Sequence, residues 1–214
     1  PYYQDSAVTL YHGDCRQIVP LLGRFDLLLT DPPYGIGENA HRIASRTKAA
    51  KTTDYGSFDW DANPPDKETV DLCVAAASGA IVWGGNYFHL PPSRGWLVWD
   101  KQNSGNFADC ELAWTNLKMS VRIFRFLWNG MIRAGEARGV PRVHPTQKPV
   151  ELLRWCLDWA PDAKTVLDPF AGSGTTGRAC KDLGRKCVMI EREEKYCEIA
   201  ARRMGQEVLP LDAA

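Results

Sequence analysis

Four consecutive residues, Asp31-Pro32-Pro33-Tyr34, carry the most distinctive chemistry in this chain of 214 residues. The two prolines fix φ and lack backbone N–H groups, so the turn offers a carboxylate and carbonyl oxygens as hydrogen-bond acceptors. An exocyclic amino group on a nucleic-acid base has two hydrogens to donate, one to the Asp31 carboxylate and one to the Pro32 carbonyl. Tyr34 adds a flat ring on which a base can stack, an interaction worth roughly 1–3 kcal/mol. The alternative interpretation is a proline-rich turn capped by Asp, with Tyr as core filler.

A second segment, Asp168-Pro169-Phe170-Ala171-Gly172-Ser173-Gly174, ends one predicted strand and opens a predicted helix. Gly172, Gly174 and Gly177 fit the pattern GxGxxG, which gives a tight turn, a close backbone approach to a ligand and a helix N-terminus. Glu191 ends the next predicted strand, where a carboxylate can accept both hydroxyls of a ribose. The combination predicts a cofactor that carries a nucleoside, either a dinucleotide or S-adenosylmethionine. A glycine turn that only packs a helix on the sheet is the alternative.

The elements that must position these segments alternate along the chain. Short runs rich in Val, Leu and Ile predict buried strands, and apolar residues at three-to-four spacing predict helices. The predicted strands span residues 8–11, 26–30, 80–83, 96–99, 165–168 and 186–191, and the predicted helices span 15–22, 67–77, 150–159, 175–183 and 193–204. This alternation predicts one α/β domain over residues 1–214, with a mostly parallel, Rossmann-like sheet whose ligands lie beyond the carboxyl ends of the strands.

Two stretches depart from the alternation. Residues 112–115 and 121–127 follow the strand at 96–99 without a clear helix between them, so we expect antiparallel additions at one edge of the sheet. Residues 35–66 show no convincing periodicity. A connection of that length in a compact domain is usually a functional lid or disordered, and we interpret it as a mobile loop.

Composition limits the class of protein. The chain has 26 Lys and Arg against 26 Asp and Glu, and 44% of its residues are hydrophobic, which suits one domain with a substantial core. No apolar run approaches the roughly 18 residues of a membrane span, and the first residues do not resemble a secretion signal. The seven cysteines include no CxxC pair and no Cys/His cluster, which indicates a reduced, intracellular protein without a metal.

Basic residues gather in two segments of this neutral chain. Such an uneven distribution suits a protein that presents one basic face to a polyanion, although two solvated loops would explain it equally well. The candidate phosphate-binding residues are Arg42, Arg46, Lys48 and Lys51 in residues 39–53, and Lys118, Arg122, Arg125, Arg133 and Arg138 in residues 118–142.

Taken together, these motifs and their order resemble the amino-methylating DNA methyltransferases, in particular the permuted β group, in which DPPY precedes FxGxG. The segment Tyr11-His12-Gly13-Asp14-Cys15 is similar to the family's entry strand, which implies that Asp14 and Cys15 lie beside the cofactor adenine. The segment His144-Pro145-Thr146-Gln147-Lys148-Pro149 is similar to the one that holds the methionine end of the cofactor. This implies that His144 positions the cofactor and that Lys148 makes a charge-assisted contact with its carboxylate. Asp168 to Gly174 and Glu191 would complete the cofactor site.

The resemblance implies methyl transfer from S-adenosylmethionine to the N6 amino group of adenine in DNA, with cytosine N4 as the alternative. DPPY is commoner with adenine and SPPY with N4-cytosine. Acceptors at Asp31 and Pro32 would favour the pyramidal nitrogen of the transition state, and the target base would flip out of the duplex. No covalent intermediate is needed, and no cysteine follows a proline as in cytosine-C5 enzymes. A bacterial or phage enzyme working in the cytoplasm is expected.

Residues 102–143 are too few for a separate large recognition domain, so we expect a reduced target-recognition region. The recognised DNA sequence would then be short or degenerate. Alternatively, residues 39–53 or a second subunit, as in a homodimer, would contribute to its recognition. Trp114, Phe124, Phe126 and Trp128 could stack on bases, but alternating aromatic residues on a strand are more often core.

Three more distant functions remain as alternatives. A nicotinamide-dependent oxidoreductase would explain the glycine motif and Glu191, but it gives no role to residues 31–34. Enzymes that methylate RNA or protein usually carry Asn-Pro-Pro-Tyr after the glycine turn. A non-catalytic nucleic-acid binder would explain the basic segments but neither motif.

Overall fold

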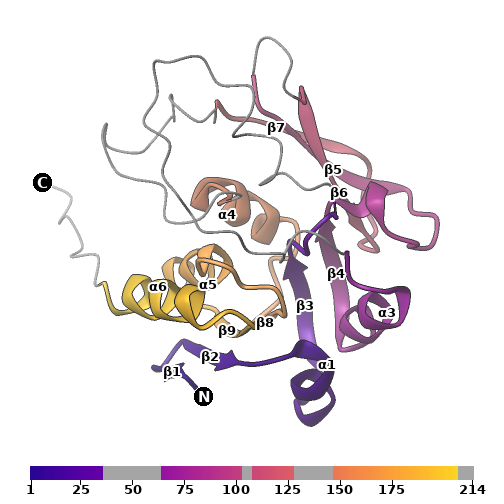
Figure 1. Ribbon diagram of the computed structural model, residues 1–214. Helices are drawn as coiled ribbons and strands as arrows, with labels where there is room; N and C mark the ends of the chain where they lie inside the picture. Colours follow the sequence, from indigo (N-terminus) through magenta and orange to yellow (C-terminus); the bar gives the residue numbers. More distant parts are fainter. Residues whose placement is uncertain (36–63, 103–107, 128–146, 207–214) are drawn as a thin grey trace, which may run out of the picture.

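A single mixed sheet lies at the centre of the fold, with helices on both of its faces (Figure 1). The computed structural model describes residues 1–35, 64–102, 108–127 and 147–206. Within these residues the strands are ordered β1-β2-β9-β8-β3-β4-β6-β5-β7. This arrangement confirms the predicted α/β fold.

The element bounds follow the predicted ones closely. The strands are β1 (Tyr3–Gln4), β2 (Val8–His12), β3 (Phe25–Thr30), β4 (Ala77–Trp83), β5 (Gly95–Asp100), β6 (Cys110–Thr115), β7 (Arg122–Arg125), β8 (Thr165–Asp168) and β9 (Lys186–Glu191). The helices are α1 (Cys15–Ile18), α3 (Lys67–Ala75), α4 (Val150–Asp158), α5 (Thr175–Asp182) and α6 (Glu194–Gly205), with 3-10 helices η1 (Val19–Leu21) and η3 (Gly85–Tyr87). The predicted helix over 15–22 is thus divided, because Pro20 lies at the start of η1 and cannot donate to a continuing α-helix.

The five central strands β2, β9, β8, β3 and β4 are parallel, and their register brings the two motifs together. Leu28 of β3 pairs with Leu167 of β8, and His12 of β2 pairs with Glu191 of β9. The carboxyl ends of these strands therefore meet at one edge of the sheet. The turn that follows β3, the glycine turn that follows β8, and Glu191 all begin at this edge.

Both faces of the central strands are buried, which explains why β3 reads as a continuous apolar run instead of an alternating one. Leu27 and Leu29 pack in a cluster with residues of α4, α5 and α6, whereas Leu28 packs with residues of α1 and α3. Figure 1 shows the same division, with α4, α5 and α6 on one side of the sheet and α1 and α3 on the other.

The edge beyond β4 contains both antiparallel and parallel neighbours. β6 is antiparallel to β4 and β5, as predicted for residues 112–115. The prediction for residues 121–127 was wrong, because β7 is parallel to β5. β6 occupies the position between β4 and β5, so the chain reverses after β6 and can pair only with the outer edge of β5.

The aromatic residues of this edge pack in the core. Trp114 is buried and its indole N–H donates to the Pro91 carbonyl at 2.7 Å. The rings of Phe124 and Phe126 stack on each other at 5.6 Å, and Phe124 also contacts Trp155 of α4 at 5.2 Å. Trp128 lies outside the described residues.

Several predicted segments cannot be compared with the structure. Residues 36–63 of the predicted mobile loop, and 103–107 and 128–146 of the predicted recognition region, lie outside the described residues. Gly35 and Pro64 are in contact, since a Cβ on Gly35 would lie 2.4 Å from Pro64 Cδ. The chain therefore leaves and re-enters the described fold at one point beside residues 31–34. In the described part, no helix has both the length and the apolar character needed to span a membrane.

Candidate functional site

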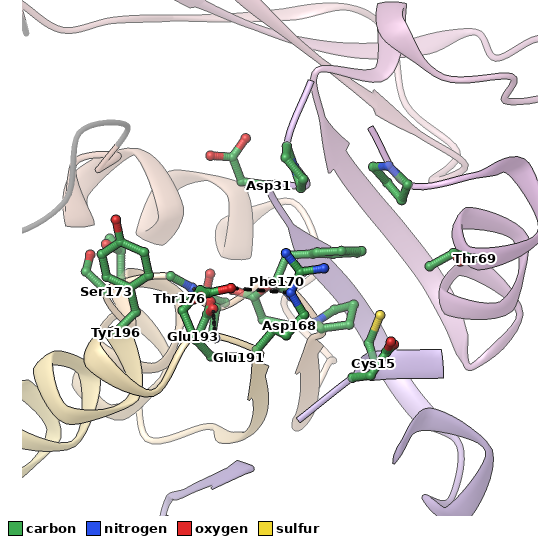
Figure 2. A pocket seen from close by; sticks show the side chains of 18 of the residues that line it. Cys15, Asp31, Thr69, Asp168, Phe170, Ser173, Thr176, Glu191, Glu193 and Tyr196 are labelled. Atoms are coloured by element: carbon green, nitrogen blue, oxygen red, sulfur yellow. Dashed lines mark hydrogen bonds and ion pairs between the residues drawn. The ribbon is translucent and has the colours of Figure 1, made fainter. Parts of the chain in front are cut away.

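A cavity of about 420 Å³ opens where the carboxyl ends of the parallel strands meet. Residues from both sequence motifs line it, and Figure 2 shows Asp31 at one end of the cavity, above Asp168 and Glu191, with Cys15 and Thr69 at its other side. Of the residues that we predicted to bind the cofactor or perform catalysis, the cavity is lined by Asp14, Cys15, Asp31, Pro33, Lys148, Asp168, Phe170, Ala171, Gly172, Ser173 and Glu191.

The glycine turn orients the Glu191 carboxylate. The backbone N–H of Gly172 donates to Oε2 at 2.7 Å, and that of Glu193 donates to Oε1 at 2.8 Å. Burial raises the pKa of Glu191, and these hydrogen bonds oppose the rise. Each carboxylate oxygen has two lone pairs, so both oxygens retain a site that can accept a hydroxyl.

Asp168 connects the two motifs inside the protein. Its side chain is 2% exposed, and Oδ1 accepts hydrogen bonds from the Thr30 hydroxyl at 2.7 Å and the Phe170 N–H at 3.2 Å. Thr30 ends β3, directly before Asp31, so this carboxylate ties the two turns together. Burial raises the pKa of Asp168 to about 6 although these hydrogen bonds oppose the rise.

Asp14 and Cys15 come from the start of α1. Asp14 caps this helix, and its carboxylate accepts hydrogen bonds from the backbone N–H of Arg16 at 2.9 Å and from the Arg16 guanidinium. This pairing with Arg16, together with the cap, lowers the pKa of Asp14. Both residues line the cavity. Gly174 caps α5 in the left-handed region and does not itself line the cavity.

The residues of the turn after β3 divide between the cavity and the core. The Tyr34 hydroxyl donates to Asp31 Oδ1 at 2.6 Å, Pro33 lines the cavity, and Pro32 is buried. Tyr34 was predicted to offer a stacking face, and its ring already stacks on Tyr87 with ring centroids 5.0 Å apart. Burial raises the pKa of Asp31, while the nearby Lys148 lowers it.

Lys148 is paired with acidic and hydroxyl groups of the protein. Its ammonium donates to Asp31 Oδ2 at 2.6 Å and to the Tyr34 hydroxyl at 3.2 Å, and it pairs with Glu111 Oε2 at 3.0 Å. An ammonium group has three N–H donors, and two of them are used by Asp31 and Tyr34. The Lys148 ammonium therefore joins the turn after β3 to Glu111 of β6, and Lys148 also lines the cavity.

Several residues in or next to the candidate site were not recognised from the sequence. Glu111 of β6 pairs with the Lys148 ammonium, but a single acid on an outer strand gives no local signal. Tyr87 follows no motif either, although its ring faces Tyr34. The remaining cavity-lining residues that we did not predict include Arg16, Pro64, Pro65, Asp66, Thr69, Gln147, Leu153, Thr175, Thr176, Arg192, Glu193 and Tyr196.

The candidate DNA-binding residues are only partly described. Lys118 is exposed, Arg122 lies over the Trp159 ring at 5.0 Å, and Arg125 pairs with Asp100 at 3.5 Å. These three lie on or beside the outermost described strands. Arg42, Arg46, Lys48, Lys51, Arg133, Arg138 and His144 lie outside the described residues. The described residues contain no group of three or more potential metal ligands.

Comparison with known proteins agrees with this geometry. A family model for DNA methylases of the N6/N4 type matches residues 98–202. These residues make up about half of the chain, and over them the chain is similar to the amino-methylating DNA methyltransferases. It is 26% identical over 259 aligned positions to the type II methyltransferase M2.LlaDCHI of Lactococcus lactis subsp. cremoris, an alignment that covers 96% of this chain and 92% of the relative. It is 25% identical to M.ScaI of Streptomyces caespitosus over 99% of this chain and 86% of the relative.

Solved structures show the same methyltransferase fold. The M1.HpyAVI complex with S-adenosylmethionine aligns with a TM-score of 0.57 and 19% identity, covering 93% of this chain and all of the other. The PvuII methyltransferase, which is specific for cytosine N4, aligns with a TM-score of 0.60 and 15% identity, covering all of this chain and 90% of the other. The alignment with M2.LlaDCHI is longer than this chain, so that methyltransferase has segments within the aligned region that this chain lacks.

The cavity residues fit the cofactor of this methyltransferase family. Its acidic lining residues are Asp14, Asp31, Asp66, Asp168, Glu191 and Glu193, and its basic lining residues are Arg16, Lys148 and Arg192. Each of these three cations pairs with one of the acids, through Asp14, Asp31 and Glu193 respectively. The remaining charge is therefore negative, which suits a sulfonium cation with a ribose and disfavours a pyrophosphate.

The raised pKa of Asp168 predicts a specific pH dependence of stability. A raised pKa in the folded state adds stability below the unfolded pKa, and this stability is lost as the pH rises through about 6. Between pH 4 and pH 7.5, the free energy of unfolding of the wild-type protein should fall by about 2.5 kcal/mol relative to that of Asp168→Asn, since each unit of pKa corresponds to about 1.4 kcal/mol. Urea denaturation across this pH range measures the difference. Asp162→Asn, at an exposed position, is the control, and an equal pH dependence in both variants would contradict the prediction.

A substitution at Gly84 should affect only the turn that contains Asp31 and Tyr34. Its φ is +68°, and an added Cβ would lie 2.0 Å from Tyr34 Cε1. Gly84→Ala should displace Tyr34 and lower methyl transfer at least about tenfold, with cofactor affinity nearly unchanged. Gly184→Ala is the matched control, because Gly184 has a φ of +66° and no neighbour within 4 Å. Both variants carry backbone strain, so only a loss of activity specific to Gly84→Ala supports the contact with Tyr34.

Proposed function

We propose that this protein transfers a methyl group from S-adenosylmethionine to the N6 amino group of adenine in DNA. This reaction is one case of a broader activity, the S-adenosylmethionine-dependent methylation of exocyclic amino groups in DNA, which the comparisons support. The observation that carries the proposal is the shared cavity: the Asp31 acceptor turn and the Glu191 carboxylate, which is suited to a ribose, both line it.

The proposed cofactor site follows the cavity from α1 to α5. Glu191 would accept the ribose hydroxyls, and Asp14 and Cys15 would lie beside the adenine. Phe170, Ala171 and Gly172 would bring the backbone close, with Asp168 fixing their turn. The methionine carboxylate would lie toward Ser173 and Thr175, whose hydroxyls line the cavity, with His144 as a further positioning residue.

Bound S-adenosylmethionine supplies a methyl group activated by the sulfonium. The protein has to present the amino nitrogen in line with that methyl group and to stabilise the charge that develops on the nitrogen. Asp31 would accept one amino hydrogen and Pro32 the other, which favours the pyramidal nitrogen of the transition state. Tyr34 fixes Asp31 through its 2.6 Å hydrogen bond, and its ring would help to hold the flipped base.

The choice of adenine over cytosine depends on the residue before the prolines. Asp31 carries a carboxylate where the N4-cytosine enzymes that the chain resembles more often carry Ser. The PvuII methyltransferase is N4-specific and shares the fold, but its low identity means that this likeness concerns the fold alone. Cytosine N4 is therefore the second candidate, and it would use the same acceptor groups.

DNA would be bound through the basic segments. Lys118, Arg122 and Arg125 lie on or next to the outer strands, and Arg133 and Arg138 belong to the same basic segment. Arg42, Arg46, Lys48 and Lys51 belong to residues 39–53, which follow the DPPY motif in the sequence. The short recognition region, residues 102–143, would leave room for a second subunit to contribute to target reading.

The relatives named type II methyltransferases suggest the biological setting. We propose that the protein modifies DNA in the cytoplasm of a bacterial cell, as the modification enzyme of a restriction system. Such an enzyme protects the cell's own DNA by methylating the target sites.

Asp31→Ala tests both the reaction and its acceptor. DNA from cells that express the wild-type protein should contain N6-methyladenine when its nucleosides are analysed by mass spectrometry. Asp31→Ala should lower turnover by a hundredfold or more, because the variant lacks an acceptor used in the transition state, while affinity for S-adenosylmethionine changes little. N4-methylcytosine in place of N6-methyladenine would select the second candidate. Near wild-type turnover in the variant would show that Asp31 is structural.

The basic segment 39–53 predicts a change in the salt dependence of DNA binding. Replacing Arg42, Arg46, Lys48 and Lys51 by Gln should weaken binding to all sequences about equally, since phosphates carry no base information. The slope of log affinity against log salt should fall by about one unit for each cation that no longer meets a phosphate. Lys186→Gln is the control, because Lys186 is exposed at the opposite end of β9. If the salt dependence of the quadruple variant is unchanged, residues 39–53 do not contact the phosphates, and residues 118–142 become the candidates for DNA binding.

A further inference from the structure

A chain of alternating charges runs from the catalytic turn to the outer strands. Asp31 pairs with Lys148 at 2.6 Å, Lys148 pairs with Glu111 at 3.0 Å, and Glu111 also pairs with Lys101. Four separate segments supply these residues: the turn after β3, the segment before α4, strand β6 and the residue after β5. A contact between such distant segments fixes the catalytic turn relative to the outer strands of the sheet.

The centre of this chain of charges is Lys148, which is buried. The residue is 6% exposed, and its ammonium lies 5.6 Å from the centroids of both the Tyr34 and Trp83 rings. A buried ammonium needs a carboxylate partner to offset its lost hydration, and Asp31 alone would supply one. The second carboxylate, Glu111, is therefore not required for charge neutrality at Lys148.

We propose that Glu111 is a positioning residue for methyl transfer: it shares the Lys148 ammonium with Asp31, so that Asp31 is held in place but is not fully neutralised by its cation. This inference rests on the proposed function, because it assigns Glu111 to the same reaction. Without Glu111, the whole charge of Lys148 would act on Asp31 and weaken it as an acceptor.

The reaction explains why the acceptor strength of Asp31 matters. The lone pair of the amino nitrogen forms the new N–C bond as the C–S bond breaks and its electron pair stays on sulfur. The nitrogen then carries a positive charge until it loses one of its two hydrogens as a proton. Asp31 accepts that hydrogen bond and is the group placed to receive the proton. A carboxylate that is paired with a cation shared by no other acid would accept the proton less readily.

The titration of Asp31 depends on the groups that face it. Among the described residues these are Lys148, Glu111 and Tyr34, together with Asp168 at the end of β8; Lys101 acts through Glu111. Burial raises the pKa of Asp31, Lys148 lowers it, and the Glu111 charge raises it. Lys148 and Lys101 in turn lower the pKa of Glu111 to about 2, so Glu111 keeps its charge over the working pH range.

Glu111→Gln tests the proposal because it removes the charge and keeps the shape. Single-turnover methylation of DNA should slow about tenfold at its pH plateau. The acid limb of the pH–rate profile should move down by roughly one unit, the size expected from one nearby charge. Glu111→Asp keeps the charge, so its acid limb should stay near the wild-type position. Glu198→Gln, on α6 and exposed, should match the wild type in both respects.

A second measurement does not need catalysis. The Asp31 carboxyl carbon can be titrated by nuclear magnetic resonance in protein labelled with ¹³C-aspartate, with Asp31→Asn used for assignment and no cofactor or DNA present. Its midpoint should be lower in Glu111→Gln than in the wild type and in Glu198→Gln. Coincident midpoints and coincident acid limbs would overturn the proposal, even if Glu111→Gln lowers the rate or the melting temperature.

The two proposals fail in different ways. If the wild-type protein transfers no methyl group to DNA, the proposed function fails, but the titration still decides whether Glu111 acts on Asp31. If the product is N4-methylcytosine, the base assignment fails and the comparison of acid limbs remains valid. If the wild-type protein is active but the titration midpoint of Asp31 is the same in Glu111→Gln, only the proposed role of Glu111 is overturned.

Discussion

The hydrogen bond from the Thr30 hydroxyl to the Asp168 carboxylate joins the ends of the two strands that lead into the two sequence motifs. β3 ends at Thr30 and leads into the acceptor turn, whereas β8 ends at Asp168 and leads into the glycine turn. Parallel pairing places both ends at the same edge of the sheet. The geometry of the cavity depends on this bond, because each turn is positioned by the last residue of its strand.

The carboxylates of the cavity have separate tasks, and their surroundings assign these tasks. Asp168 is buried beside hydroxyl and amide donors, and burial raises its pKa, so it suits a structural role. Glu191 is oriented by two backbone N–H groups and keeps lone pairs for a sugar. Of these three acids, Asp31 is the one paired with a buried cation, which favours its charged form at the place where an amino group would arrive. Burial and partners, more than residue type, distinguish the three acids.

The sequence was sufficient for the fold and for much of the cavity because both depend on local patterns. Apolar runs predicted β3, β8 and β9, and the parallel topology then placed Asp31, Asp168 and Glu191 together. The direction of β7 was missed because a short edge strand carries no signal for its partner. Glu111 was missed for a similar reason: its importance comes from Lys148, which is distant in the sequence and reaches it only in the folded chain.

Lys148 shows how a motif can be recognised while its chemistry is assigned incompletely. The sequence placed it beside the cofactor, and it does line the cavity. A lysine before a helix has no fixed direction, however, and its long side chain can reach either the cofactor or the catalytic turn. The two partly buried carboxylates favour the turn, because an ammonium without its hydration shell is held most strongly where two acids converge. Asp31 and Glu111 provide that convergence, so the acceptor turn depends on an outer strand that no catalytic motif includes.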